Sequence, residues 1–174
     1  PGVEVVAACD THTPRLEAFC SRYRVPLSYA SFDELLREAR PRFVVIATPP
    51  FTHAALCRAA VDSGVAALVE KPACLSLAEA RELAAHAAKA GVPVAVMQNY
   101  RFKANVQKAL ALHRSGELGE LYRIDCVYHG GAPVAQSEAW RREERRNRLL
   151  LYEWAQHFLD IEVAFAGPLR EILA

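Results

Sequence analysis

Two short apolar runs, each stopped by proline, constrain the fold of this chain most. Phe43–Ala47 is followed by Thr48-Pro49-Pro50, and Ala66–Val69 by Glu70-Lys71-Pro72. Their continuous apolar character predicts buried strands, and Phe43–Ala47 is expected to be buried on both faces. Each strand ends at proline, which has no N–H for the ladder. Thr48 and Lys71 therefore follow the carboxyl ends of two strands, the edge of an open parallel sheet where ligands bind. A surface ion pair beside a turn is the alternative for Glu70 and Lys71.

The rest of the first hundred residues alternates between apolar runs and helical segments. Ser31 to Glu34 and Ser76 to Glu79 have the pattern of capping boxes, and Thr13-Pro14 predicts a helix with Thr13 as its N-cap. Alternating strands and helices indicate a parallel sheet with right-handed crossovers. The predicted strands are Val3–Asp10, Leu27–Tyr29, Phe43–Ala47, Ala66–Val69 and Pro93–Gln98, and the other predicted helices are 32–39, 52–62 and 77–90.

After Phe102 the pattern changes from α/β to α+β. A helix is predicted over Ala104–Ser115, and the alternation of apolar and polar residues in Leu121–Tyr128 predicts an antiparallel strand with one wet face. A second helix is predicted over Leu149–Asp160, and a further strand over Pro168–Leu173. We therefore predict two domains, 1–102 and 103–174.

Composition narrows the class of protein. Apolar residues make up 52% of the chain and the formal net charge is +1, which favours a globular fold and gives no electrostatic reason for a nucleic-acid or membrane partner. The five cysteines form no Cys-x-x-Cys pair, so neither a zinc site nor a disulfide framework is indicated, and a reducing, cytoplasmic location is expected. Because the sequence begins at Pro1 rather than Met, a preceding leader stays open.

Three motifs, in this order and spacing, resemble the Gfo/Idh/MocA (glucose–fructose oxidoreductase / inositol dehydrogenase) family. They are Ala47-Thr48-Pro49-Pro50-x-x-His53, Glu70-Lys71-Pro72 and Gln98-Asn99-Tyr100-Arg101-Phe102. The resemblance covers nearly the whole chain. It implies an NAD(P)-dependent oxidoreductase that transfers a hydride between a nicotinamide cofactor and a sugar, polyol or related alcohol. It also implies a partial Rossmann domain, then part of a substrate and dimerisation domain with an open, mainly antiparallel sheet, in a full-length form that is a homo-oligomer.

Several residues are candidates for cofactor binding. An acid at the end of the second strand of a dinucleotide-binding fold binds the adenosine ribose, so Asp10 favours NAD, with NADP still possible; the alternative is a turn residue. The resemblance places Thr48, Pro49, Glu70, Lys71 and Asn99 along the nicotinamide. His53 either orients the Pro49-Pro50 turn or is a helix-start residue without a ligand.

The glycine motif of such a fold is not found in this sequence. It is expected about 20 residues before the acid, but only nine residues precede Asp10, and Gly2 is the one glycine among them. We therefore expect a fragment of a longer protein, truncated at both ends, in which two strand edges are unpaired. A non-catalytic, ligand-sensing relative and an inactive fragment are the alternative functions.

The predicted helix 149–160 carries the candidate acid/base. Glu153, His157 and Asp160 have spacings of four and three and so share one face. This resembles the family's Asp-x-x-x-His helix, with His157 as the proton acceptor and Glu153 in the place of the aspartate. Lys71 either donates a hydrogen bond to the substrate oxygen or is itself the base. From spacing alone, a structural histidine, a simple helix pair and a metal site on this face are alternatives.

Substrate contacts are expected from Lys71, Arg101 and His157. The basic run Trp140–Arg146 stands before the place where family members carry a glycine-rich turn. Either it is a solvated helix face, or Arg145, Arg146 or Arg148 meets an anionic substrate group.

Overall fold

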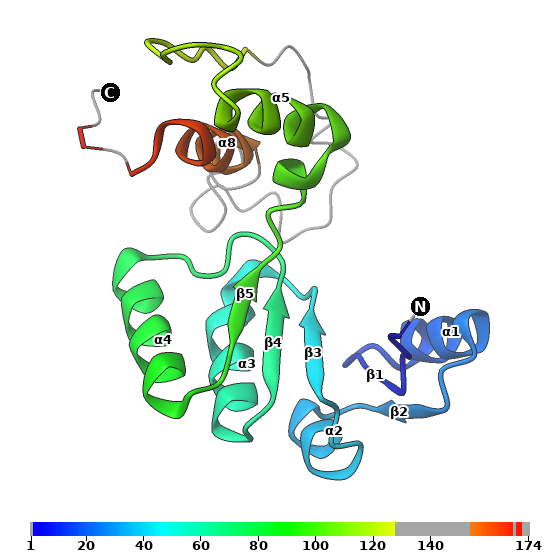
Figure 1. The fold of residues 1–174 in the computed structure, drawn as a ribbon. Helices are drawn as coiled ribbons and strands as arrows, with labels where there is room; N and C mark the ends of the chain where they lie inside the picture. Colours follow the sequence, from blue (N-terminus) through cyan, green and yellow to red (C-terminus); the bar gives the residue numbers. More distant parts are fainter. Residues whose placement is uncertain (1, 128–153, 169, 172–174) are drawn as a thin grey trace. The chain divides into compact units, whose positions relative to one another are not determined.

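The computed structural model describes residues 2–127, 154–168 and 170–171 (Figure 1). The chain divides into two compact units, Pro1–Val96 and Met97–Ala174. The division falls shortly before the predicted domain boundary at Phe102, and the roles of the two domains stay predictions. No helix in the described ranges has the length and apolarity needed to cross a membrane.

Five parallel strands form the framework of the first unit, as their alternation with helices predicts (Figure 1). They belong to two sheets. One pairs β1 with β2, and the other has the order β3-β4-β5, with Phe43 opposite Ala66 and Ala67 opposite Val94. The bounds are β1 Ala7–Cys9, β2 Leu27–Tyr29, β3 Phe43–Ile46, β4 Ala66–Val69 and β5 Val94–Val96.

The two sheets separate between β1 and β3. Among the described strands β1 pairs with β2 alone and β3 with β4 alone, so each has one edge without a strand partner in this part of the chain. These are the two unpaired edges that the sequence predicts.

Four helices connect the strands of this unit, namely α1 Thr13–Tyr23, α2 Phe32–Glu38, α3 Pro50–Asp62 and α4 Leu77–Ala90. The predicted serine caps are confirmed, because the Ser31 and Ser76 hydroxyls accept from the backbone N–H of Glu34 and Glu79 at 3.4 and 3.2 Å. The predicted Thr13 cap is wrong. His12 caps α1 instead, with its Nδ1 accepting from the Arg15 N–H at 3.2 Å.

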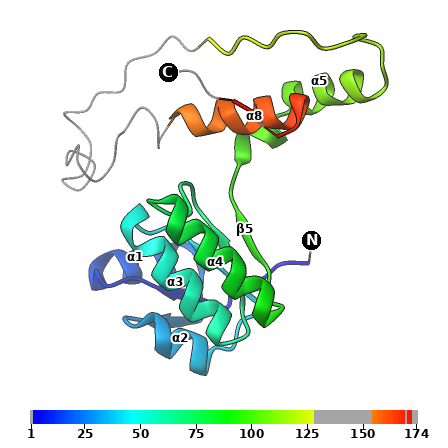
Figure 2. The ribbon, with the colours of Figure 1, turned by 90° about the vertical axis from the view of Figure 1, so that its left-hand side faces the viewer.

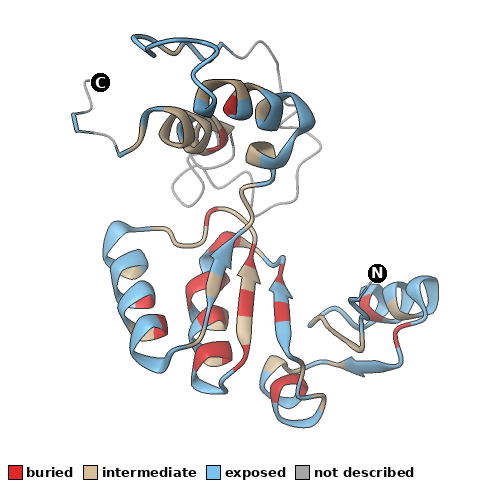
Figure 3. Ribbon diagram, in the orientation of Figure 1, coloured by how far each residue is buried: buried red, intermediate tan, exposed pale blue. Residues whose placement is uncertain are grey.

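The core lies between one face of the β3-β4-β5 sheet and the adjacent helices α3 and α4 (Figures 2 and 3). Val44 and Val69 point into it from the strands, and Cys57, Ala60 and Leu83 meet them from the helices. Burial of an apolar side chain in such a layer contributes about 1.5–3 kcal/mol.

The opposite face of β3 is open. Phe43 is 42% and Val45 55% exposed, so the prediction that Phe43–Ala47 is buried on both faces is wrong. The helices α3 and α4 cover the face of Val44 and Ile46. A continuous apolar run is compatible with a strand that is buried on both faces. The second face is buried only where another helix or sheet packs against it.

The second unit is helical where it is described. It contains the 3₁₀ helix η1 (Asn99–Phe102), α5 (Ala104–Arg114) and α8 (Gln156–Ala166), and α8 ends at Gly167, whose φ is +81°. α8 thus continues beyond the predicted end at Asp160, while residues 149–153 of that predicted helix lie outside the described ones.

The predicted strand Leu121–Tyr128 is wrong over residues 121–127, which have no regular structure; Tyr128 lies outside the described residues. Alternation of apolar and polar residues suits a strand only where a neighbouring strand pairs with it, and no described segment of this unit does so. Pro168, Arg170 and Glu171 are not in a strand either, and the rest of the predicted strand 168–173 is not described.

Leu83 and Leu77 on α4 offer a matched test of the core. Leu83 is 4% exposed and Leu77 65% exposed. We expect Leu83→Ala to lower the free energy of unfolding by about 2–5 kcal/mol, through lost burial and a residual cavity. Leu77→Ala should change it by less than about 0.5 kcal/mol. Urea denaturation followed by circular dichroism measures both, and equal effects would contradict the placement of α4.

Candidate active site

The carboxyl ends of β3 and β4 carry the predicted site residues of the first unit. Thr48 follows β3 and is exposed, and its hydroxyl lies 2.6 Å from that of Thr52 on the first turn of α3. The Thr52 hydroxyl donates to the Pro49 carbonyl at 2.8 Å. The Thr52 hydroxyl proton is therefore engaged with Pro49, so the Thr48 hydroxyl is the donor in the bond to Thr52. The oxygen lone pairs of Thr48 stay available to solvent.

His53 ties the loop after β3 to the loop after β4. Its side chain is buried, with 1% exposed. Its Nε2 lies 2.7 Å from the Thr48 carbonyl oxygen, and its Nδ1 lies 2.7 Å from that of Pro72. These contacts favour the interpretation that His53 orients the loops around it, rather than that of a helix-start residue.

Glu70 and Lys71 continue β4 at this edge. The Glu70 N–H donates to the Ile46 carbonyl at 2.8 Å, which extends the pairing with β3 by one residue. The Glu70 carboxylate accepts from the Lys71 backbone N–H at 3.2 Å. Both side chains are half-buried, so a ligand at the strand ends can reach them.

Asp10 lies directly after β1 and forms a turn. Its Oδ1 accepts from the His12 N–H at 2.8 Å, and its Oδ2 lies 3.7 Å from the Arg15 guanidinium. A carboxylate bonded to the N–H two residues ahead is an Asx-turn, which supports the turn interpretation. The ribose role stays a prediction.

His157 of α8 belongs to a separate group of predicted site residues, within the second unit. It is 5% exposed, and its ring stacks on Tyr100 of η1 with centroids 4.1 Å apart and an interplanar angle of 11°. The Lys103 Nζ lies 3.2 Å from the Tyr100 centroid. The stacked imidazole leaves no room for an ammonium on its side, so Lys103 lies on the other face of the tyrosine ring. The Phe158 ring meets Tyr100 edge-on at 83°.

Arg101 and Asp160 form a two-point pair that joins η1 to α8. The Arg101 Nε donates to Oδ2 at 2.9 Å and its Nη2 to Oδ1 at 2.5 Å, with a further bond from Nη2 to the Asp160 carbonyl at 3.1 Å. The hydrogen bond with Asp160 raises the pKa of the Arg101 guanidinium. His157 and Asp160 thus both face η1, as their spacing predicts. These bonds occupy the guanidinium fork and support a positioning role for Arg101, whereas its contact with substrate stays a prediction.

Other predicted site residues lie elsewhere or are not described. Asn99 is exposed at the start of η1. Glu153, Arg145, Arg146 and Arg148 lie outside the described residues. Within the described ranges no group of three or more His, Cys, Asp or Glu side chains could hold a metal ion.

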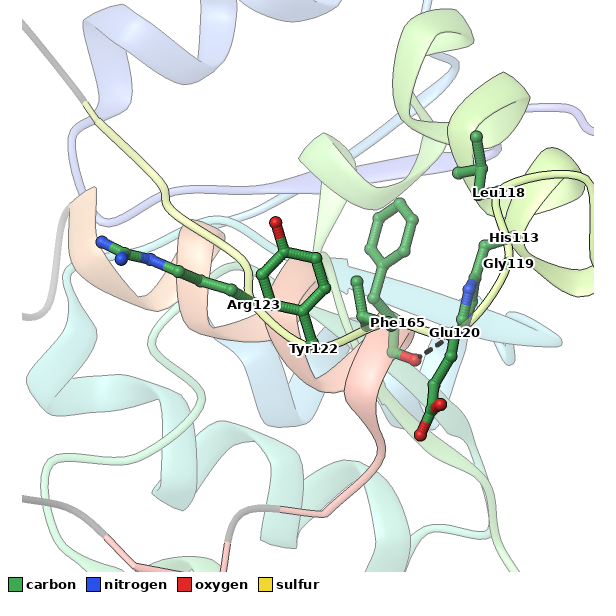
Figure 4. A pocket seen from close by; sticks show the side chains of 8 residues that line it. His113, Leu118, Gly119, Glu120, Tyr122, Arg123 and Phe165 are labelled. Carbon is green, nitrogen blue, oxygen red and sulfur yellow. Dashed lines mark hydrogen bonds between the residues drawn. The ribbon is translucent and has the colours of Figure 1, made fainter.

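A separate hollow of about 160 Å³ lies in the second unit (Figure 4). His113 Nε2 reaches the Phe165 carbonyl across it at 3.0 Å, and Tyr122 is 96% exposed at its rim. None of the predicted site residues lines it; the lining residues are His113, Leu118, Gly119, Glu120, Leu121, Tyr122, Arg123 and Phe165. It therefore does not belong to the candidate site.

Three contacts in the structure have no counterpart among the sequence predictions. Thr52 reaches Thr48, Tyr100 stacks on His157, and Asp160 pairs with Arg101. The first contact is local, because Thr48 lies just before the N-cap Pro49 and Thr52 is on the first turn of α3. The other two contacts join segments more than fifty residues apart in the sequence, so the spacing of residues within a helix or strand does not predict them.

The chain matches one protein family and several relatives. The model of the oxidoreductase family with an NAD-binding Rossmann fold, GFO_IDH_MocA, matches residues 1–98. D-apiose dehydrogenase of Paraburkholderia graminis is 30% identical over 99% of this chain and 46% of its own length. The chain thus spans about half the length of such relatives.

Solved structures agree with the fold. A probable dehydrogenase from Thermotoga maritima superposes with a TM-score of 0.80 at 20% identity, over 95% of this chain and 48% of that one. GenD2 from gentamicin A biosynthesis, solved in complex with NAD, is 32% identical with a TM-score of 0.62, over 67% of this chain and 33% of its own.

The pair of Arg101 and Asp160 predicts a local loss of stability when it is broken. We expect Asp160→Asn to lower the free energy of unfolding by about 1–3 kcal/mol, because a hydrogen-bonded, half-buried guanidinium loses its charged partner. Asp125→Asn, in an exposed pair with Arg123, should cost less than about 1 kcal/mol. Chemical denaturation of both variants measures the difference. An Asp160→Asn variant as stable as Asp125→Asn would show that the pair does not hold η1 and α8 together.

Proposed function

This chain belongs to the Gfo/Idh/MocA family of oxidoreductases with an NAD-binding Rossmann fold, and from that premise we propose that it is the NAD-binding and catalytic part of an enzyme that oxidises a sugar, polyol or related alcohol. The observation that carries the proposal is the edge formed by the carboxyl ends of β3 and β4. There an exposed hydroxyl, Thr48, and a half-buried ammonium, Lys71, follow neighbouring parallel strands. This edge is where open α/β sheets bind their ligands.

The residues at this edge fit a nicotinamide cofactor. Thr48 and Pro49 would hold it from the loop after β3, and Glu70 and Lys71 from the loop after β4, with Asn99 as a further contact. Asp10 would meet the ribose, which favours NAD over NADP. When bound, the cofactor accepts a hydride from the substrate carbon.

The protein must handle the proton that leaves the substrate oxygen. Lys71 carries donors suited to an oxygen that gains negative charge. The imidazole of His157 accepts a proton near neutral pH, which suits the same task. We propose His157 as the proton acceptor and Lys71 as the hydrogen-bond donor, with Lys71 as base the alternative. Tyr100 and Arg101 support this assignment because they orient α8 and the His157 ring. Glu153 is proposed as the acidic partner of His157.

The substrate class follows from the family and from relatives. D-apiose dehydrogenase is named for a sugar, and we propose that this chain also acts on a polyhydroxylated compound. Such a substrate offers hydroxyls to Lys71, His157 and Arg101, the three residues proposed to contact it.

Lys71→Ala separates chemistry from cofactor binding. We expect the Kd for NADH to change by about two- to threefold, as for the loss of one weak hydrogen bond, and turnover to fall by about 10²- to 10³-fold because the donor at the substrate oxygen is gone. NADH fluorescence titration and a screen of sugars and polyols with NAD measure the two effects. Lys89→Ala, an exposed lysine on the last turn of α4, is the control and should change neither.

Two outcomes would count against the proposal. Wild-type chain that is folded but does not bind NADH would exclude an autonomous nucleotide site. Binding without turnover of any alcohol, unchanged by Lys71→Ala, would favour a ligand-sensing relative.

A further inference from the structure

His53 makes two short contacts with groups that can only accept hydrogen bonds. It lies on α3, 1% exposed, with Nδ1 and Nε2 each 2.7 Å from a backbone carbonyl oxygen, those of Pro72 and Thr48. The two carbonyls belong to the loops that carry Lys71 and Thr48. Both loops and the histidine lie within the first unit.

The donors and acceptors in these contacts can be counted. A carbonyl oxygen has lone pairs and no proton, and a neutral imidazole has one N–H and one nitrogen lone pair. With a neutral ring, one contact would set a nitrogen lone pair against an oxygen lone pair at 2.7 Å, which is repulsive. With two ring protons both contacts are N–H···O bonds, and their length is that of charge-assisted bonds.

We propose that His53 is a doubly protonated imidazolium that fastens the loop after β3 to the loop after β4 and so sets the positions of Thr48 and Lys71. It is a positioning residue, because its buried ring reaches the loops through their backbone. Burial opposes a charge, and hydrogen bonds to the charged form offset that cost; both N–H groups have an acceptor here. The positioning part of this inference rests on the proposed function, whereas the protonation part does not.

The shape of the site explains why histidine suits this position. The two ring nitrogens point to opposite sides of a rigid five-membered ring, so a single side chain reaches both loops. Glutamine has one donor nitrogen and can serve one loop, while phenylalanine keeps a flat ring and serves neither. The series His, Gln, Phe therefore removes the two bonds stepwise.

The protonation of His53 is tested by NMR of chain labelled with ¹⁵N-histidine at pH 7. We expect both His53 ring nitrogens to have protonated ¹⁵N shifts and to retain their protons. One nitrogen with the shift of an unprotonated acceptor would overturn the proposal. The signals are assigned with His53→Gln; if this variant does not fold, substitution of the other five histidines one at a time (His12, His86, His113, His129 and His157) assigns them by elimination.

The positioning role is tested by NADH affinity and kinetics. We expect kcat/KM to fall on the order of 10²-fold in His53→Phe, since misplaced catalytic groups lose rate steeply, with His53→Gln between it and wild type. The matched control is His86→Gln on α4, whose ring pairs with Asp62 near the surface; it should retain wild-type values. Wild-type NADH affinity and kcat/KM in a folded His53→Phe would overturn the positioning role.

The two tests separate this inference from the proposed function. If the wild-type chain neither binds NADH nor turns over an alcohol, the proposed function fails and the positioning role fails with it. The NMR measurement decides the protonated link between the loops in either case.

Discussion

The packing of α3 against β3 and β4 is the contact on which the first unit depends. Cys57 and Ala60 are small and fully buried in the core that α3 shares with the strands. Burial raises the pKa of the Cys57 thiol to about 11, and at neutral pH Cys57 is an uncharged core residue. Because α3 begins directly after the loop that follows β3, this packing also brings Thr52 and His53 to the candidate site.

The second unit depends on a different kind of contact. Two of its described segments, η1 and α8, are joined by the charged fork of Arg101 on Asp160 and by the Tyr100 ring on His157. Planar groups restrict orientation more than aliphatic contacts do, since a bidentate pair and a stacked ring pair each require a defined geometry. The candidate acid/base is therefore held by groups that limit rotation of its ring, which is the condition for preorganised chemistry.

Much of the first unit could be predicted from sequence because its signals are local. Ser31 and Ser76 are followed by glutamate three residues later, and both cap helices as expected. The prediction of Thr13 as the cap is wrong because the His12 ring nitrogen accepts the hydrogen bond from the Arg15 N–H instead. The sequence pattern alone does not show which of two adjacent residues is the N-cap. The prediction of a strand over residues 121–127 is wrong for another reason. A strand needs a neighbouring strand to pair with, and the sequence pattern of a single segment does not show whether one is present.

The sequence by itself determined the order of strands and helices in the first unit, the proline stops after β3 and β4 and the spacing of His157 and Asp160, because these follow from backbone chemistry and helix periodicity. Only the tertiary structure decided which face of β3 is covered and that the strands form two sheets. It also brought the His53 ring to the carbonyls of Thr48 and Pro72, which are five and nineteen residues away in the sequence. It also paired Arg101 with Asp160, fifty-nine residues apart. Burial and hydrogen bonding depend on which groups meet in space, and distance along the chain does not specify that.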